Sequence, residues 1–238
     1  MTNKTLEEYY NRTSKRFWNP TGGLQGRDHL VDELTVNCEG SFLEYGCGAG
    51  SLLVELSRRA QFTQCYGIDI SLNALQKIET AWSALELSKQ LNLNQPVNDL
   101  LPFIENEKID LLVSVATIEH VIDPYKVLDE LHRIASPGAT LICSVPNYAY
   151  IKHRVALLMG RLPKTGTDEP VKNWREAGWD GMHLHTFTKE AFSTLLIDCG
   201  WRPVEWTGWG EKYKFISKYR KKYPGLLSGE IMARCVKI

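Results

Sequence analysis

The sequence lacks the features that would place it in a membrane, in an oxidising compartment or on a nucleic acid. None of its apolar runs approaches the ~20 residues of a membrane-spanning helix, and the start, MTNKTLEEYYNR, is polar and unlike a signal peptide. Lysine plus arginine and aspartate plus glutamate both number 28, so no overall positive field attracts nucleic acid. The six cysteines are scattered and form no C-x-x-C pair. We therefore expect a cytoplasmic protein with reduced thiols, no structural metal and no membrane partner.

The composition is that of an ordinary globular chain that can fill a hydrophobic core. The chain has 238 residues, of which 43% are hydrophobic and 24% are charged, and this length suits one domain. It contains no internal repeat and no low-complexity segment. We expect a single domain over residues 1–238, with a helical cap at residues 1–36 and an inserted lid at residues 146–182, where hydrophobic periodicity is weak.

The most informative stretch is SFLEYGCGAGS, residues 41–51. A short apolar run leads into Gly46, Gly48 and Gly50, and leucines at helical spacing follow from Leu52. Strand, glycine turn and helix are how an open α/β sheet presents its first loop to a ligand. Glycine is needed there because the ligand approaches the backbone more closely than a Cβ atom allows. Such a turn also occurs in proteins that bind no cofactor, so its spacing matters.

The spacing departs from the dinucleotide-binding pattern G-x-G-x-x-G. The third glycine comes one residue early, Ser51 stands in its place, and Glu44 lies two residues before the first glycine. The pattern E-x-G-x-G-x-G resembles motif I of the class I S-adenosylmethionine-dependent methyltransferases. Their cofactor has no phosphate and carries an amino-acid end that a carboxylate can pair with. The resemblance implies S-adenosylmethionine as cofactor, and a nicotinamide-dependent oxidoreductase of the same fold is the alternative.

The rest of the chain alternates between strand and helix patterns. Helices are expected at residues 4–18, 26–36, 72–93, 123–135 and 188–199, and strands after the motif at residues 63–68, 97–100, 109–115, 139–145, 202–206 and 229–238. This order is similar to that of the methyltransferase family. The resemblance implies an α/β fold: a Rossmann-like, doubly wound, seven-stranded sheet with an antiparallel last strand, N-terminal helices and an inserted lid.

Several residues are expected to hold the cofactor. Asp69 lies about 20 positions after the glycine turn, where an acidic residue can bind ribose hydroxyls, and Ser71 is suited to cap the next helix. The resemblance implies that Asp99 and the backbone of Leu100 contact the adenine and that an N-terminal tyrosine contacts the cofactor. A solvated Asp99 and a Tyr10 that only packs on the sheet are the alternatives. The expected set is Tyr10, Glu44, Gly46, Gly48, Gly50, Asp69, Ile70, Asp99, Leu100 and Ala116.

Methyl transfer from a sulfonium depends mainly on alignment of donor and acceptor. A base is needed only when the acceptor is a poor nucleophile such as an alcohol, and histidine is the usual base near neutral pH. His120 follows the strand at residues 109–115, where ligands bind in such sheets. His183 and His185 lie in the stretch MHLHTFT. If that stretch is extended, alternate side chains face opposite ways, so we expect His185 to face the substrate and His183 to face outward. His120, His185 and His183 are therefore the catalytic candidates, and anchoring of loops is the alternative for each.

The stretch Glu119 to Pro124, EHVIDP, resembles the E-H-V-x-D-P motif of the ubiquinone-biosynthesis O-methyltransferases. In that group a glutamate three residues before the E-H pair helps to hold a divalent metal, but this chain has Ala116 there. We therefore expect no metal and a metal-free base.

The chain from about residue 40 to 200 also resembles MetW-like proteins, so a partner role in methionine biosynthesis is an alternative to catalysis. Four cations at residues 152–164 suggest a small anionic acceptor, such as one from a glycan, nucleotide-sugar or natural-product pathway. RNA methylation is a third alternative that rests on the basic and aromatic run 212–222, and the balanced net charge counts against it.

Overall fold

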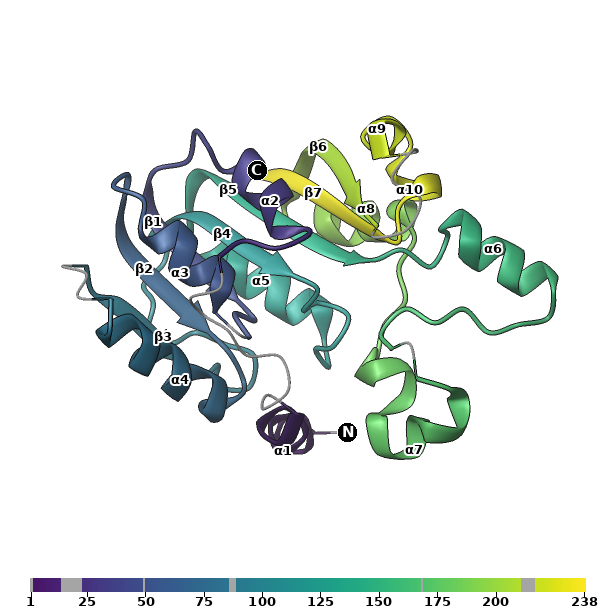
Figure 1. The fold of residues 1–238 in the computed structure, drawn as a ribbon. Helices are drawn as coiled ribbons and strands as arrows, with labels where there is room; N and C mark the ends of the chain where they lie inside the picture. The colour runs from purple at the N-terminus through teal and green to yellow at the C-terminus, as the bar shows by residue number, and fades with distance from the viewer. Residues whose placement is uncertain (1, 14–22, 49, 86–88, 168, 211–216) are drawn as a thin grey trace.

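The computed structural model describes residues 2–13, 23–48, 50–85, 89–167, 169–210 and 217–238. Its centre is one seven-stranded sheet in the order β3-β2-β1-β4-β5-β7-β6 (Figure 1). Strands β1 to β5 pair in parallel, and β7 lies antiparallel between β5 and β6. The expected fold class, with its antiparallel last strand, is confirmed. The strands are β1 (Gly40–Tyr45), β2 (Phe62–Ile68), β3 (Leu91–Asn94), β4 (Ile109–Val115), β5 (Ala135–Pro146), β6 (Trp201–Trp209) and β7 (Glu230–Lys237).

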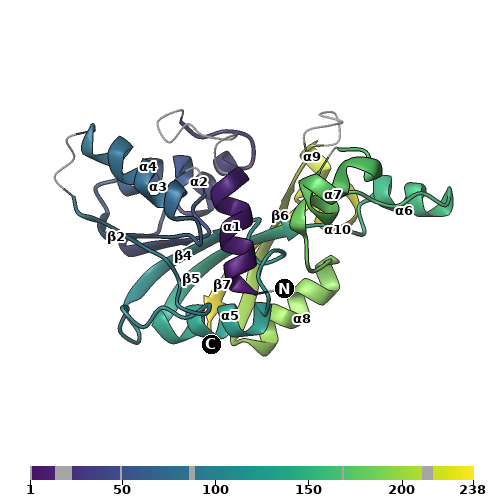
Figure 2. The same ribbon diagram turned by 90° about the horizontal axis from the view of Figure 1, so that it is seen from below.

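Helices cover both faces of the sheet. Figure 2 shows α2, α3 and α4 on one side and α5 and α8 on the other. Two clusters of buried apolar side chains fill these two layers, as a parallel sheet buried on both faces requires. The helices are α1 (Asn3–Thr13), α2 (Asp28–Leu34), α3 (Ser51–Ser57), α4 (Leu72–Ser83), α5 (Pro124–Ile134), α6 (Ile151–Leu158), α7 (Trp174–Ala177), α8 (Lys189–Asp198), α9 (Ser217–Arg220) and α10 (Pro224–Leu227), with short 3-10 turns η1 (Val171–Asn173) and η2 (Trp179–Met182).

Polar residues at helix starts fix where several helices begin. The side chains of Ser71, Asp123 and Thr188 accept hydrogen bonds from the backbone N–H groups three residues later, at the starts of α4, α5 and α8. Each bond satisfies a donor that the helix itself leaves unpaired. Pro124 occupies the first turn of α5, where its missing N–H costs nothing. The expected cap at Ser71 is confirmed.

The sequence prediction was wrong at residues 84–85 and 89–100, whereas residues 86–88 of the expected helix lie outside the described residues. The helix expected to run to Leu93 ends at Ser83, and the third strand is Leu91–Asn94 rather than residues 97–100. The alternating Leu-Asn pattern pairs with β2 at the edge of the sheet, which the helical interpretation missed. Residues 97–100 form a tight turn in which Val97 and Leu100 exchange backbone hydrogen bonds.

Two other expectations concern the redox state of the cysteines and membrane-spanning helices. All six cysteines are free and buried, in agreement with reduced thiols. Within the described ranges no helix is both long enough and apolar enough to cross a membrane. Residues 14–18 of the first expected helix and residues 212–216 of the basic run lie outside the described residues.

Gly50 shows why the third glycine of the motif is required. It precedes α3 with a φ of +79°, a left-handed conformation that favours glycine. A Cβ atom at this position would lie 2.6 Å from Cγ1 of Ile78 on α4. Gly50 therefore lets α3 start in the turn and pack against α4.

We expect Gly50→Ala to lower the free energy of unfolding by about 2–3 kcal/mol, because backbone strain of about 1 kcal/mol adds to the clash with Ile78. Gly138→Ala is the matched control, since Gly138 has a φ of +75° and, within the described part of the chain, no atom lies within 4 Å of an added Cβ. Urea unfolding of both variants measures the difference. Equal losses would show that Gly50 serves only the backbone conformation.

Candidate functional site

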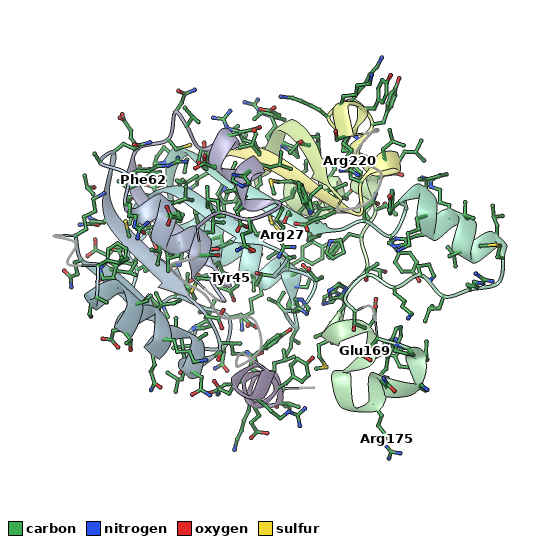
Figure 3. The ribbon with its side chains drawn as sticks, in the orientation of Figure 1. Arg27, Tyr45, Phe62, Glu169, Arg175 and Arg220 are labelled. Atoms are coloured by element: carbon green, nitrogen blue, oxygen red, sulfur yellow. The ribbon has the colours of Figure 1, made fainter. Side chains whose placement is uncertain are left out.

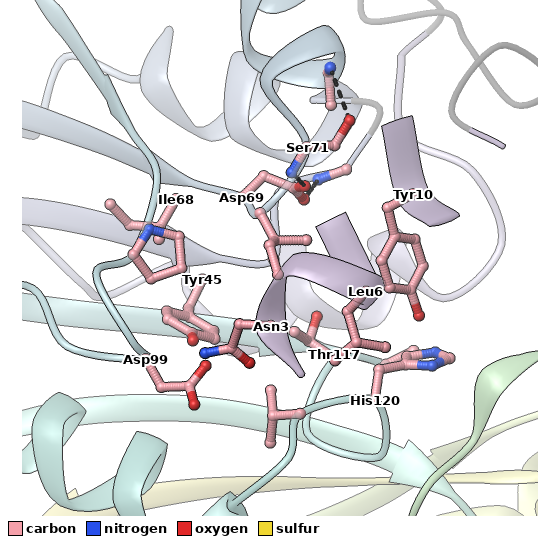
Figure 4. Close-up of a pocket in the computed structure, with 17 residues that line it drawn as sticks. Asn3, Leu6, Tyr10, Tyr45, Ile68, Asp69, Ser71, Asp99, Thr117 and His120 are labelled. Carbon is pink, nitrogen blue, oxygen red and sulfur yellow. Dashed lines mark hydrogen bonds between the residues drawn. The ribbon is translucent and has the colours of Figure 1, made fainter. Parts of the chain in front are cut away.

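A cavity of about 270 Å³ opens at the carboxyl ends of β1, β2 and β4 (Figure 4). Helix α1 lies across this edge of the sheet and contributes part of the wall (Figure 2). The expected cofactor residues and His120 supply about half of the lining, and neighbouring residues supply the rest. The cavity is lined by Asn3, Leu6, Tyr10, Tyr45, Gly46, Gly48, Ile68, Asp69, Ile70, Ser71, Ala74, Pro96, Asp99, Ala116, Thr117, His120 and Val121.

The glycine turn forms the floor of this cavity. A Cβ atom on Gly46 would overlap the Thr117 side chain, which fixes glycine at that position. At Gly48 an added Cβ would meet no atom of the described residues closer than 4.0 Å, which leaves room for a ligand beside it. The Gly48 N–H donates a 2.8 Å hydrogen bond to Oδ2 of Asp69. The turn after β1 is thus tied to the end of β2.

Asp69 is half-buried, and its carboxylate holds two backbone groups. Its Oδ1 accepts a 2.8 Å hydrogen bond from the Ser71 N–H, and its Oδ2 accepts the bond from Gly48. Burial raises the pKa of Asp69 above its ordinary value, while these two bonds oppose the shift. Each carboxylate oxygen can accept more than one bond, so Asp69 retains the capacity to bind ligand hydroxyls.

Asp99 reaches the cavity from the tight turn at residues 97–100. Asn98 and Asp99 have φ values of +51° and +67°, and positive φ at both central residues is the signature of a type I′ turn. Aspartate and asparagine tolerate this conformation better than most residues. The turn buries Asp99, whereas Leu100 is exposed and does not line the cavity.

Glu44 also lies outside the cavity lining. Side chains alternate along β1, so Tyr45 faces the cavity and Glu44 faces the layer of α2 and α3. Its carboxyl is buried near the backbone of Leu53 in the first turn of α3, and burial raises its pKa well above the ordinary value. Oε2 has no hydrogen-bond partner in the part of the chain that the structure describes. Of the expected cofactor residues, Glu44, Gly50 and Leu100 are thus the ones that do not line the cavity.

Tyr10 closes the other end of the cavity. It comes from α1, and its ring meets the His120 ring edge-on with centroids 5.8 Å apart. Burial raises the pKa of Tyr10, so the phenol is neutral. Its hydroxyl is buried and, among the described residues, has no hydrogen-bond partner. A buried hydroxyl of this kind is suited to a ligand or water partner.

His120 presents a free nitrogen as a result of its other hydrogen bond. Its Nδ1 lies 3.0 Å from the carbonyl oxygen of Met182, and a carbonyl can only accept, so Nδ1 carries the proton. Nε2 of the neutral ring therefore has an available lone pair. Burial lowers the pKa of His120, which keeps this ring neutral at pH 7.

His183, rather than His185, reaches His120. The two rings lie 4.7 Å apart between centroids. Nδ1 of His183 is 2.7 Å from Oγ1 of Thr165, and this hydroxyl donates to Asp180, so Nδ1 is the donor to Thr165. Burial and the neighbouring His120 lower the pKa of His183 to about 4. Its Nε2 is therefore also an unprotonated acceptor.

His185 points away from the cavity lining. Its Nε2 lies 3.0 Å from the carbonyl oxygen of Val121 and 3.3 Å from that of Ile122, and it donates to these acceptors. The backbone N–H groups of Leu184 and His185 both donate to the carbonyl oxygen of Glu119. This pairing joins the H-L-H stretch to the loop after β4 and turns His183 toward the site.

Glu119 is the main residue that the sequence did not single out as part of the site. It is fully buried, and both carboxyl oxygens are without a hydrogen-bond partner within the described ranges. Oε1 lies 3.9 Å from Nε2 of His120 and 3.9 Å from Nε2 of His183. Burial raises the pKa of Glu119 to about 8. The motif EHVIDP pointed to Glu119 in the sequence. Its proximity to His183 could not be predicted, because it depends on the tertiary fold.

The side chains of Glu119, His120 and His183 lie close enough together to bind a cation, since their ligand atoms all lie within 4.8 Å of one another. Two imidazole nitrogens and one carboxylate are a donor set for zinc or another transition ion, whereas magnesium prefers oxygen ligands. Ala116 offers no carboxylate at the position where the related motif has one. The residues present therefore do not suit magnesium, and the absence of any metal stays a prediction.

Comparison with known proteins agrees with this geometry. The model of a methyltransferase domain family matches residues 4–205. The chain is 25% identical to a ubiquinone biosynthesis O-methyltransferase of Coxiella burnetii, over 73% of this chain and 83% of the relative. It is 28% identical to norajmaline N-methyltransferase of Rauvolfia serpentina, over 69% of this chain and 66% of the relative. With the mitochondrial ubiquinone biosynthesis O-methyltransferase of Dictyostelium discoideum the identity is 26%, and the match spans only 56% of that protein.

Solved structures show the same fold. A S-adenosylmethionine-dependent methyltransferase from Aquifex aeolicus superimposes with a TM-score of 0.65 at 17% identity, covering 96% of this chain and 98% of the other. The [4+2]-cyclase SpnF superimposes with a TM-score of 0.69 at 16% identity, covering 99% of this chain and 96% of the other. With the family model, the strand order and the cavity above the glycine turn, these matches lead to one assignment. The chain belongs to the class I S-adenosylmethionine-dependent methyltransferase family, and S-adenosylmethionine is its cofactor.

Proposed function

We propose that the protein transfers the methyl group of S-adenosylmethionine to a hydroxyl of a small molecule, with His120 as the base. The observation that carries this proposal is the neutral His120 ring, whose proton is fixed on Nδ1 and whose Nε2 is free at the cavity. A hydroxyl acceptor gains from such a base, whereas an amine or thiol acceptor needs only alignment. The ubiquinone biosynthesis relatives, named as O-methyltransferases, support an oxygen acceptor.

The cofactor would lie along the carboxyl ends of β1 and β2. Asp69 and Asp99 line the part of the cavity at which ribose and adenine are expected, and the open side of Gly48 gives room for the amino-acid end. Glu44, on the opposite face of β1, would act by holding the first turn of α3 rather than by direct contact. Bound in this way, S-adenosylmethionine supplies an electrophilic methyl group beside His120 and Tyr10.

The proton would pass from the acceptor hydroxyl to Nε2 of His120. A positive charge on this ring favours ionisation of Glu119, whose Oε1 is 3.9 Å away. Before reaction, the raised pKa keeps Glu119 largely neutral at pH 7, so it adds little negative charge that would raise the pKa of His120. His183 does not line the cavity but packs against the His120 ring, and its low pKa keeps it neutral.

The nature of the acceptor is proposed from its reacting group alone. Lys152, Arg154, Arg161 and Lys164, which suggested an anionic substrate, all lie away from the residues that line the cavity. A partner role like that of MetW proteins is the alternative in which methyl transfer is secondary. The fold also occurs in a protein named for another reaction, the [4+2]-cyclase SpnF.

For the cofactor site we expect Asp69→Asn to weaken binding of S-adenosylhomocysteine by about 10- to 100-fold, because a hydrogen bond to a charged group contributes ~1.5–3 kcal/mol. Isothermal titration calorimetry measures this affinity. Asp198→Asn, an exposed aspartate on α8, is the control for the same chemical change. Binding of NAD in place of S-adenosylhomocysteine would contradict the cofactor assignment itself.

For the base we expect His120→Ala to reduce kcat/KM by ~10²–10⁴-fold with unchanged affinity for S-adenosylhomocysteine. His185→Ala, which removes an imidazole outside the cavity, should keep most of the rate. The acceptor is first found by release of S-adenosylhomocysteine from a panel of hydroxyl and amine compounds. Because burial lowers the pKa of His120, the rate should already be on its plateau at pH 7 and fall in acid. Loss of activity on chelation with EDTA, or normal turnover in His120→Ala, would contradict the proposal that His120 acts as the base without a metal ion.

For Glu119 we expect a pH-dependent stability difference from Glu119→Gln. The pKa is raised to about 8 in the folded state from an ordinary 4.5, so the folded chain binds more protons than the unfolded chain between these values. The stability of the wild type therefore falls as pH rises, and the neutral glutamine avoids this loss. In urea unfolding, the free energy of unfolding of the variant should rise relative to that of the wild type by on the order of 4 kcal/mol from pH 5 to pH 9.

Glu105→Gln, which changes an exposed carboxyl, is the control and should gain little over the same range. A difference between Glu119→Gln and the wild type that stays constant with pH would mean that Glu119 keeps its charge throughout. A carboxylate bound to a cation would behave in this way.

A further inference from the structure

Helix α6 stands apart from the body of the protein. It follows β5 and projects away from the sheet, with its side chains spread outward (Figures 1 and 3). His153 is its one buried residue and attaches the helix through a 3.0 Å hydrogen bond between Nδ1 and the Asn147 carbonyl. The helix is therefore attached through His153, and its other residues are exposed or half-buried.

The open side of α6 is apolar. Successive residues of a helix turn by about 100°, so Ile151, Val155 and Leu158 fall on one stripe, roughly opposite His153. Leu158 is 87% exposed, and Ile151, Val155 and the following Met159 are exposed as well. In a helix of a water-soluble domain such a stripe normally faces the core. Here no described residue covers it.

Cations border this stripe. By the same rotation Lys152 and Arg154 lie on its two sides, and Arg161 and Lys164 follow in the next segment. No acidic residue occurs from Ile151 to Thr167, although acids and bases balance over the whole chain. The positive charge is thus local to the projecting helix.

We propose that α6 is a docking surface for an anionic membrane, on which it lies without crossing. An exposed apolar stripe between flanking cations is the arrangement of interfacial helices, in which aliphatic side chains enter the acyl boundary and Lys and Arg reach the headgroups. The charge decides this occupant over a second copy of the chain, because two such helices would bring their cations together. The proposal concerns a surface outside the cavity and does not depend on the methyl acceptor.

The test is flotation of the whole protein with vesicles of phosphatidylcholine and phosphatidylserine in equal parts, and with vesicles of phosphatidylcholine alone. The wild type should float with the anionic vesicles and not with the neutral ones, and added salt should weaken the binding. Leu158→Ser should weaken it by about tenfold or more, since it removes a side chain that would be buried in the lipid. Lys152→Glu with Arg161→Glu should abolish it.

Two control variants carry the same chemical changes elsewhere. Ile197→Ser removes an exposed aliphatic side chain from α8, and Arg202→Glu with Lys222→Glu reverses two exposed cations outside α6. Both should float like the wild type. Binding of S-adenosylhomocysteine confirms that every variant is folded, because none of these residues lines the cavity.

The proposal is overturned if the wild type does not float, or if the α6 variants bind as well as their controls. It is also overturned if light scattering shows a dimer that Leu158→Ser dissociates, in the absence of vesicle binding. In that case the stripe is a contact between two copies of the chain.

Discussion

The hydrogen bond from the Gly48 N–H to Asp69 joins the two loops on which the cofactor site depends. It connects the glycine turn after β1 with the end of β2, and the second oxygen of Asp69 holds the start of α4 through Ser71. One carboxylate therefore positions two helix starts and one wall of the cavity. One residue can hold both loops because the carboxyl ends of parallel strands meet at one edge of the sheet, where their loops lie close together.

Desolvation governs the other half of the site. Glu119, His120 and His183 bring three acceptor atoms together in the interior, and burial pushes each group toward its neutral form. The backbone carbonyl of Met182 and the hydroxyl of Thr165 fix which nitrogen of each ring keeps its proton. The result is a pair of neutral imidazoles beside a carboxyl with a raised pKa. Such a group of shifted pKa values is typical of functional sites.

The projecting helix α6 shows a different balance of forces. Most apolar residues of this chain serve the two layers that cover the sheet, but those of α6 face outward and are bordered by charge. The cavity and this surface lie on different parts of the molecule and can be changed separately. Catalysis and localisation would thus be governed by separate residues.

The sequence by itself determined the elements whose signals are local. The glycine turn, Asp69, the cap at Ser71 and the strand at residues 109–115 follow from spacing, propensity and alternation. It failed at residues 89–100, because the alternation of the edge strand β3 is only four residues long and Asp99 reaches the cavity through a turn with positive φ. Only the tertiary structure decided that His183 rather than His185 meets His120, and that Glu119 lies between them. These contacts join segments more than 60 residues apart, and the packing that sets them leaves no mark on either segment alone.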